Sequence, residues 1–173
     1  MLTAMVDRWR QAADDADLEA AAADLGYTPQ ELMTVASLVQ AEGRGDDMPK
    51  IARVIDNRLE IEPNPSAGFL QVDASVNYAL DRPTVAVLTQ DEIDSVADSP
   101  YNTYTQKGLP PTPIEAPGDD AIAAAAHPAD GPWFFYVTTN LRTGETKFTD
   151  SYDEFLQFKD ELQQYCETQS DRC

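Results

Sequence analysis

The chain has 173 residues, of which 31 are acidic and 12 basic, giving a formal net charge of −19. A surface this negative repels nucleic acid and anionic lipid, so the composition argues against either partner. No apolar run reaches the length of about 18 residues that a membrane span needs. Residues 1–9 also lack the apolar region of a secretory signal. The sequence therefore predicts a chain that is soluble as it stands.

Helical periodicity dominates the first part of the chain. Residues 2–25 predict a helical segment, with apolar residues at helical spacing: Leu2, Met5, Val6, Trp9 and Ala13. Thr28 and Glu31 form a capping box around Pro29, which predicts a helix that ends near Gly43. A further helix is expected over 49–59. Arg58 lies on its apolar stripe, so we expect a buried acid or carbonyl group to meet it.

The second half of the chain mixes loops, short helices and a hairpin. Short helices are expected over 75–80 and after Thr89, followed by a long irregular stretch at 98–118 of the kind that is usually functional. An Ala-rich helix at 118–127 precedes two strands, which the pattern predicts as a hairpin. The strands cover 133–138 and 145–149, and a last helix begins near residue 151.

These patterns predict an α+β fold, dominated by helices, with one small antiparallel hairpin. We divide the chain into an N-terminal helical segment (1–25), a main domain (26–165) and a C-terminal tail (166–173). The two cysteines, Cys166 and Cys173, stand close together at the end of the chain. A short disulfide loop and a pair of free thiols are about equally compatible with that spacing.

Glu42 is the first candidate for catalysis. Helical projection places it at the edge of the apolar stripe, in the last turn of its helix. Apolar neighbours and the negative end of the helix dipole would both raise the pKa of its carboxyl group. A general acid that protonates a glycosidic oxygen needs such a pKa. From the pattern alone, an ordinary surface glutamate near a helix end is the commoner explanation.

Several polar and aromatic residues occupy positions that folding propensity does not explain. Amides and tyrosines gathered on loops suit sugar binding, although turn formation explains Asn102 equally well. The candidates for substrate binding are Asn57, Gln71, Asp73, Tyr101, Asn102, Thr103 and Tyr104. His127, the single histidine, directly precedes Pro128 and is better explained as a helix end. With no cluster of ligands around it, the sequence predicts neither a metal nor a cofactor.

Five motifs follow one another along the chain, at residues 36–42, 51–59, 70–79, 99–104 and 108–114. Taken in this order, they resemble the YceG-like family of endolytic murein transglycosylases, and the resemblance extends over roughly residues 18–158. It implies that Glu42 is the catalytic glutamate and that Arg58, next to Asn57, supports the glycan cleft. It also implies that Gln71 and the 101–103 segment line this cleft. Where many members carry a second glutamate, this chain has Gln40, and a histidine common near residues 146–147 is absent.

The resemblance also implies a reaction and a location. Glycan strands of peptidoglycan would be cut between N-acetylmuramic acid and N-acetylglucosamine without water, leaving 1,6-anhydromuramic ends. One glutamate suffices because the attacking hydroxyl belongs to the substrate. The family acts outside the cytoplasmic membrane, with an anchor and a small LysM-like lobe upstream, and cell-wall synthesis proteins are expected partners. That location favours the Cys166–Cys173 disulfide.

Three other functions stay open at this point. A non-catalytic peptidoglycan-binding module would use the tyrosines and amides without Glu42. A hydrolytic muramidase would need a second carboxylate, for which Asp73 is the candidate. An intracellular interaction domain would rest on the acidic surface alone.

Overall fold

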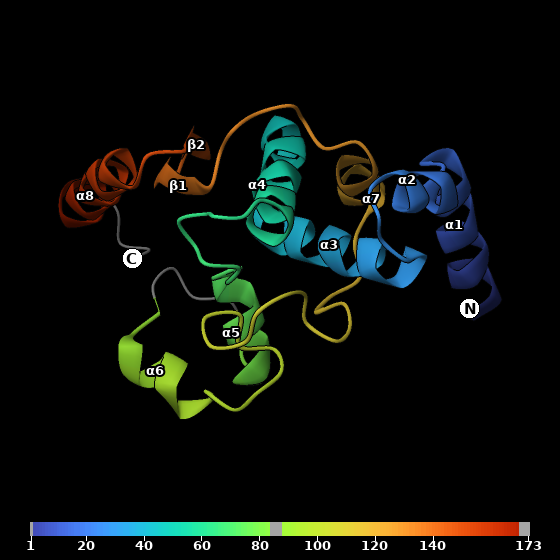
Figure 1. Cartoon of the computed structure of the whole chain (residues 1–173), viewed down its shortest axis with the longest axis horizontal. Helices are drawn as coiled ribbons and strands as arrows, with labels where there is room; N and C mark the ends of the chain where they lie inside the picture. Colours follow the sequence, from blue (N-terminus) through green and yellow to red (C-terminus); the bar gives the residue numbers. More distant parts are fainter. Residues whose placement is uncertain (1, 84–87, 170–173) are drawn as a thin grey trace.

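The computed structural model describes residues 2–83 and 88–169 (Figure 1). The described part is rich in helices and has one two-stranded sheet, which confirms the predicted α+β class. Its elements are α1 (Leu2–Asp15), α2 (Leu18–Asp24), α3 (Pro29–Glu42), the 3-10 turn η1 (Gly45–Asp47), α4 (Met48–Glu60), α5 (Asp73–Ala79), α6 (Gln90–Ser95), α7 (Asp119–Ala126), β1 (Phe135–Asn140), β2 (Glu145–Thr149) and α8 (Tyr152–Gln169).

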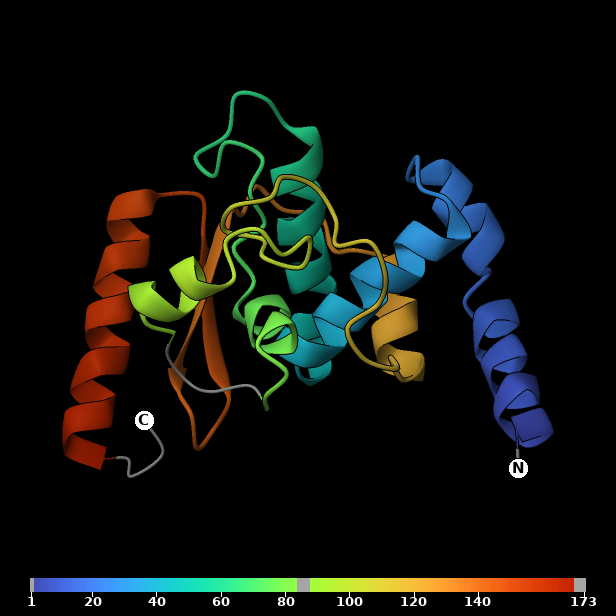
Figure 2. The same cartoon turned by 90° about the horizontal axis from the view of Figure 1, so that it is seen from below.

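The hydrophobic core is built around α3, which packs against α2, α4 and α7. Leu32 and Val39 on α3 are fully buried, as is Ile51 on α4. Burying side chains of this size contributes about 1.5–3 kcal/mol each, so this contact dominates the stability of the domain. Figures 1 and 2 show α1 and α8 at opposite ends of the molecule, with α3 and α4 between them.

The predicted N-terminal helical segment is two helices rather than one. Asp17 adopts a left-handed conformation (φ 48°), which ends α1 and turns the chain into α2. The predicted apolar stripe of α1 lies mostly on the surface, because Met5 and Trp9 are 62% and 47% exposed. α1 instead meets the core through Ala12. The division at residue 25 stays a prediction.

β1 and β2 pair as an antiparallel hairpin, with Phe135 opposite Thr149. β1 begins two residues later than the sequence pattern predicts. The carbonyl groups of Trp133 and Phe134 accept hydrogen bonds from α4 side chains, so they do not take part in a regular ladder. α8 packs along β1 and covers the sheet (Figure 2). The sheet is thereby fixed against α4 on one side and α8 on the other.

The predicted start of α3 is confirmed in detail. The Thr28 hydroxyl accepts a hydrogen bond from the Glu31 amide, and the Glu31 carboxylate accepts one from the Thr28 amide. Thr28→Ala should therefore lower the free energy of unfolding by about 1 kcal/mol, because the amide loses its partner at the first turn of the central helix. Urea denaturation of the native chain and the Thr28→Ala variant measures this difference. An unchanged midpoint would contradict the role of Thr28 as the N-cap of α3.

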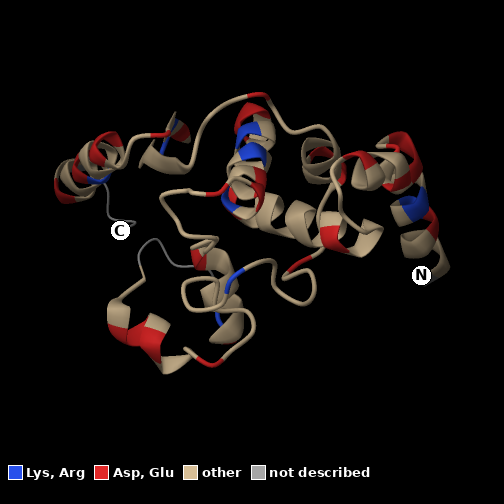
Figure 3. Ribbon diagram, in the orientation of Figure 1, with Lys and Arg blue, Asp and Glu red and all other residues tan. Residues whose placement is uncertain are grey.

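Acidic residues are spread over most of the described helices, including α1, α6 and α8 (Figure 3). None of the described helices is long and apolar enough to cross a membrane. Cys166 lies on α8 and is not a free thiol. Cys173 lies outside the described residues, so the predicted pairing of these two cysteines stays a prediction.

Candidate active site

Glu42 is the last residue of α3, and the end of this helix is held tightly against α4. Gly43 follows it, and a Cβ atom there would lie 3.0 Å from both the Met48 Cγ and the Val39 carbonyl oxygen. Only glycine allows this approach without a shift of the two neighbours. The close contact fixes the position from which the Glu42 side chain leaves the helix.

Three elements meet at the Glu42 carboxyl group. The Ala74 amide, at the start of α5, donates a hydrogen bond to Oε1 at 3.1 Å. The Tyr136 hydroxyl, on β1, donates one to Oε2 at 3.1 Å. Each carboxyl oxygen therefore has one protein donor, and the group is held between α3, α5 and β1. A carboxyl fixed in this way is oriented before any substrate arrives.

The surroundings raise the pKa of Glu42. Desolvation is the largest cause, and the nearby Asp73 carboxylate adds to it. The hydrogen bonds from Ala74 and Tyr136 and the charge of Arg58 act in the opposite direction but do not cancel the increase. The carboxyl thus keeps its proton to a higher pH than an ordinary glutamic acid. This agrees with the apolar environment expected from the sequence.

Asp73 lies beside Glu42 as the first residue of α5. The Tyr104 hydroxyl donates a hydrogen bond to Asp73 Oδ1 at 2.5 Å. Burial is the main cause that raises the pKa of Asp73, while this hydrogen bond and the Lys159 ammonium lower it. The structure therefore brings two of the predicted site residues, Asp73 and Tyr104, next to the candidate catalytic group.

Tyr136 was not among the residues that the sequence pointed to. Burial and the neighbouring Glu42 carboxyl raise its pKa well above the usual value, so the phenol stays protonated and acts as a donor. In the folded strand, buried and half-buried positions alternate along β1, and Tyr136 occupies one of the half-buried positions. That pattern does not say what the residue meets, because its partner lies 94 positions away.

Asn57 and Arg58 hold the segment that leads into β1. Arg58 is 6% exposed, and its guanidinium donates to the carbonyls of Phe134, at 2.7 Å, and Leu70. These are the buried carbonyl partners that the sequence led us to expect. The Asn57 amide donates to the carbonyl groups of Gly131 and Trp133. Both side chains are occupied by the protein itself and fix the strand that carries Tyr136.

The segment 101–104 divides into two buried and two half-buried side chains. Asn102 is fully buried, and its amide donates to the carbonyl groups of Ile93 and Val96. Thr103 is also buried, and its hydroxyl accepts a hydrogen bond from the Val72 amide. Neither side chain reaches a surface that a sugar could touch. Tyr101 and Tyr104 remain the members of this segment that can contact a ligand.

Gln71 stands two residues before Asp73 with its side chain exposed and its backbone in the left-handed region (φ 52°). This conformation costs a residue with a Cβ about 1 kcal/mol, so a glutamine kept there suggests that its amide is used. Gln71→Gly should raise the free energy of unfolding by up to about 1 kcal/mol, because glycine adopts this conformation without strain. Thermal unfolding of the native chain and the variant tests this, and a lower midpoint for the variant would contradict the strain at Gln71.

Gln40, which stands where the resemblance places a second glutamate, lies outside this cluster. Its Oε1 atom accepts a hydrogen bond from the Gly118 amide at 2.9 Å, at the start of α7. His127 follows the last residue of α7, as predicted for a helix end. Within the described residues, no group of three or more histidine, cysteine or acidic side chains is arranged to hold a metal ion.

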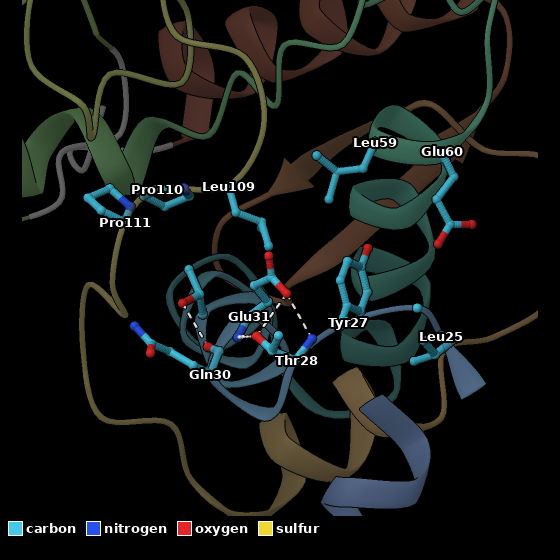
Figure 4. A pocket seen from close by; sticks show the side chains of 12 residues that line it. Leu25, Tyr27, Thr28, Gln30, Glu31, Leu59, Glu60, Leu109, Pro110 and Pro111 are labelled. Carbon is cyan, nitrogen blue, oxygen red and sulfur yellow. Dashed lines mark hydrogen bonds between the residues drawn. The ribbon is translucent and has the colours of Figure 1, made fainter. Parts of the chain in front are cut away.

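One cavity in the described part lies away from the Glu42 cluster. It has a volume of about 710 Å³ and opens at the beginning of α3, between the loop at Leu109 and the end of α4 near Glu60 (Figure 4). Thr28, on its wall, is separated from Glu42 by the whole of α3, about 20 Å at the normal helical rise. We place the candidate site at the Glu42 cluster, because Glu42 and Asp73 are carboxyl groups whose pKa is raised by burial. The Glu31 carboxylate on the cavity wall is exposed and caps the start of α3.

The fold and site define a helix-rich domain that encloses one glutamic acid between two hydrogen-bond donors. A sequence profile of the YceG-like family matches residues 1–161. The chain therefore belongs to the YceG-like family, which confirms the resemblance seen in its motifs.

Two curated relatives and one solved structure extend this result. The endolytic murein transglycosylase of Bacillus subtilis (strain 168) is 37% identical over 132 residues, covering 75% of this chain and 34% of that protein. The protein of that name from Streptococcus pneumoniae (strain D39) is 30% identical over 130 residues, covering 73% of this chain and 22% of that protein. A YceG-like protein of Listeria monocytogenes has a TM-score of 0.70 at 28% identity, covering 84% of this chain and 45% of that one. The chain thus spans about a third or less of the curated relatives it matches.

Proposed function

We propose that this chain is the catalytic part of a lytic transglycosylase that cleaves the glycan strands of peptidoglycan. The observation that carries the proposal is the enclosed Glu42 carboxyl, with its raised pKa and its two fixed donors. The two relatives that match most of this chain are named endolytic murein transglycosylases, which supports peptidoglycan as the substrate.

In the proposed reaction, Glu42 first donates its proton to the oxygen that joins N-acetylmuramic acid to N-acetylglucosamine. The bond from the anomeric carbon to that oxygen breaks, and positive charge develops on the sugar ring. The Glu42 carboxylate then accepts the proton of the muramic 6-hydroxyl, whose oxygen attacks the same anomeric carbon. The products are a 1,6-anhydromuramic end and a free N-acetylglucosamine hydroxyl, and Glu42 regains its proton without using water.

The neighbours of Glu42 have separate tasks in this scheme. Ala74 and Tyr136 fix the carboxyl, so that the same group can give and take a proton without turning. Asp73, held by the Tyr104 hydroxyl, supplies negative charge near the anomeric carbon and helps to keep Glu42 protonated. Gln71 is proposed to contact the glycan.

Two substitutions should shift the pH profile of kcat/KM in opposite directions. The first step needs protonated Glu42, so kcat/KM falls as pH rises through its pKa. Tyr136→Phe removes a hydrogen bond that lowers this pKa, and the alkaline limb should move to higher pH. Asp73→Asn removes a charge that raises it, and the limb should move to lower pH. Shifts of both variants in the same direction would contradict the assignment of Glu42 as the acid.

The location of the proposed substrate indicates where the protein acts. Because peptidoglycan lies outside the cytoplasmic membrane, we propose that the chain works there. A membrane anchor carried by another part of the protein and contact with cell-wall synthesis proteins are parts of the same proposal. A Cys166–Cys173 disulfide would fit this oxidising location.

Asp73 also supports a second candidate function. Its carboxyl group lies close enough to Glu42 to affect the pKa of the latter. A hydrolytic muramidase uses two such groups, one as acid and the other to activate water or to form a covalent intermediate. The glycan and the bond would be the same in this reaction, and only the new end of the strand would differ.

Cleavage and binding are separated by one experiment on purified, insoluble peptidoglycan. Native chain and Glu42→Gln are incubated with it, and both released sugar and co-sedimented protein are measured. We expect equal sedimentation, with sugar released by the native chain only. Sedimentation without release by the native chain would favour a non-catalytic binding module. Absence of sedimentation for both would contradict the proposed substrate.

A further inference from the structure

The cavity at the beginning of α3 has an acidic and aromatic wall that the proposed reaction does not use. Figure 4 shows the ring of Tyr27 between the carboxylates of Glu31 and Glu60, with the apolar side chains of Leu59 and Leu109 beside them. Among the described residues that line the cavity there is no lysine, arginine or histidine. Its volume of about 710 Å³ lies within the usual range for ligand sites, about 300–1,000 Å³. The cavity can therefore hold a ligand, and its charge favours a cation.

A buried acid lies at the Tyr27 hydroxyl. Asp56 on α4 is 2% exposed, and its Oδ1 atom accepts a hydrogen bond from the Tyr27 hydroxyl at 2.9 Å. Its Oδ2 atom is buried and has no hydrogen-bond partner among the described residues. Leu59 and Glu60, three and four residues later, line the cavity, so helical spacing directs Asp56 toward the same space. A buried polar atom without a partner is uncommon in native proteins and calls for an explanation such as a bound ion.

The negative charge around Tyr27 is not balanced by the protein. The charges of Asp56, Glu60 and Glu31 all act on its hydroxyl. Burial, followed by the charge of Glu60, raises the pKa of Asp56 to about 6. The Arg53 guanidinium acts in the opposite direction, but no lysine or arginine in the described part of the chain forms an ion pair with any of these three acids. A cation supplied by a ligand would lower the cost of holding them together.

We propose that this cavity binds the ammonium group of a lysine-type side chain carried by a peptide. The ammonium lies among the carboxylates and against the Tyr27 ring, which adds a cation–π attraction. The aliphatic stem packs against Leu59 and Leu109. The amide of Gln30, also on the wall, makes no side-chain hydrogen bond within the described residues and can bind the peptide backbone. The site is separate from the Glu42 cluster and makes no use of its chemistry.

The test is an NMR titration of the isotope-labelled native chain with Nα-acetyl-lysine amide. Salt at about 0.15 M screens the long-range attraction of any cation to the acidic surface. The backbone amide signals of Gly26 and Thr28, which line the cavity, should shift and saturate. Nα-acetyl-norleucine amide, which has the same aliphatic chain without the ammonium, should cause no comparable shift. n-Pentylamine should bind more weakly than the lysine amide, because it lacks the peptide groups.

Two variants show whether binding is specific to the cavity. Glu60→Gln should weaken binding of the lysine amide by up to about fivefold, the loss expected for one partly exposed ion pair, and Asp56→Asn should also weaken it. Glu62→Gln is the matched control, since Glu62 is exposed in the following loop and does not line the cavity. It should bind as the native chain does.

Separate results would overturn each part of the inference. Equal weakening in Glu60→Gln and Glu62→Gln would mean general attraction to an acidic chain and no site. Absence of any shift with the lysine amide, or an equal shift with the norleucine amide, would rule out the ammonium as the ligand. Equal or tighter binding of n-pentylamine would rule out the peptide as its carrier. None of these measurements involves glycan cleavage, so the role of Glu42 is tested independently.

Discussion

Glu42→Gln should lower the rate of glycan cleavage by about 10²–10⁴-fold, the usual contribution of a general acid or base. The amide is similar in size and can still accept a hydrogen bond from Tyr136 or Ala74, so the fold should be kept. It cannot donate a proton to the glycosidic oxygen with useful acidity. Initial rates of release from purified glycan strands measure the loss.

Glu19→Gln is the matched control for this substitution. Glu19 is an exposed residue of α2 that makes no side-chain hydrogen bond among the described residues. Its replacement is the same chemical change at a position away from the Glu42 cluster, and it should leave the rate unchanged. A small effect of Glu42→Gln, similar to that of Glu19→Gln, would mean that another group supplies the proton.

Arg58→Ala should lower the free energy of unfolding by about 3 kcal/mol. Two buried carbonyl groups, on Phe134 and Leu70, lose their donor, and an unpaired buried acceptor costs about 1–3 kcal/mol. The stem of Arg58 also packs in the interior, and its guanidinium lies 5.6 Å from the centre of the Phe135 ring. Urea denaturation followed by circular dichroism measures the change.

Arg142→Ala is the control for Arg58→Ala, because Arg142 is exposed in the hairpin turn and its side chain makes no ion pair in the described residues. It should change the free energy of unfolding by no more than about 0.5 kcal/mol. Equal stability of the two variants would show that the carbonyl groups at the entry of β1 find other partners. The role of Arg58 as a support for the site would then be wrong.

The helices around the core were predictable because their signals are local. Thr28 and Glu31 cap α3 through neighbours three positions apart, and the stripe that includes Leu32 and Val39 faces α4 and α7 as helical spacing requires. The break at Asp17 was missed, because alanine-rich sequence continues on both sides of it and nothing but its backbone angle marks the turn. Apolar spacing also did not reveal that Trp9 lies on the surface.

Site residues were predictable only where their position in a local sequence pattern was itself unusual. Glu42 stands out at the edge of an apolar stripe, and Arg58 stands out as a charge within one. Tyr136 and Ala74 reach Glu42 from elements that meet only in the folded chain, so no spacing in the sequence indicates them. Asn102 looked like a ligand for sugar because its polarity was visible and its carbonyl partners in the segment around α6 were not.

The most direct test of the central claim is cleavage of purified glycan strands in water enriched in heavy oxygen, with the new ends identified by mass spectrometry. Native chain and Glu42→Gln are compared side by side. A transglycosylase that uses Glu42 alone should yield 1,6-anhydromuramic ends without the heavy isotope, and these should disappear in Glu42→Gln. Reducing ends that carry the heavy isotope would contradict it, and would make the protein a hydrolase in which Asp73 takes part.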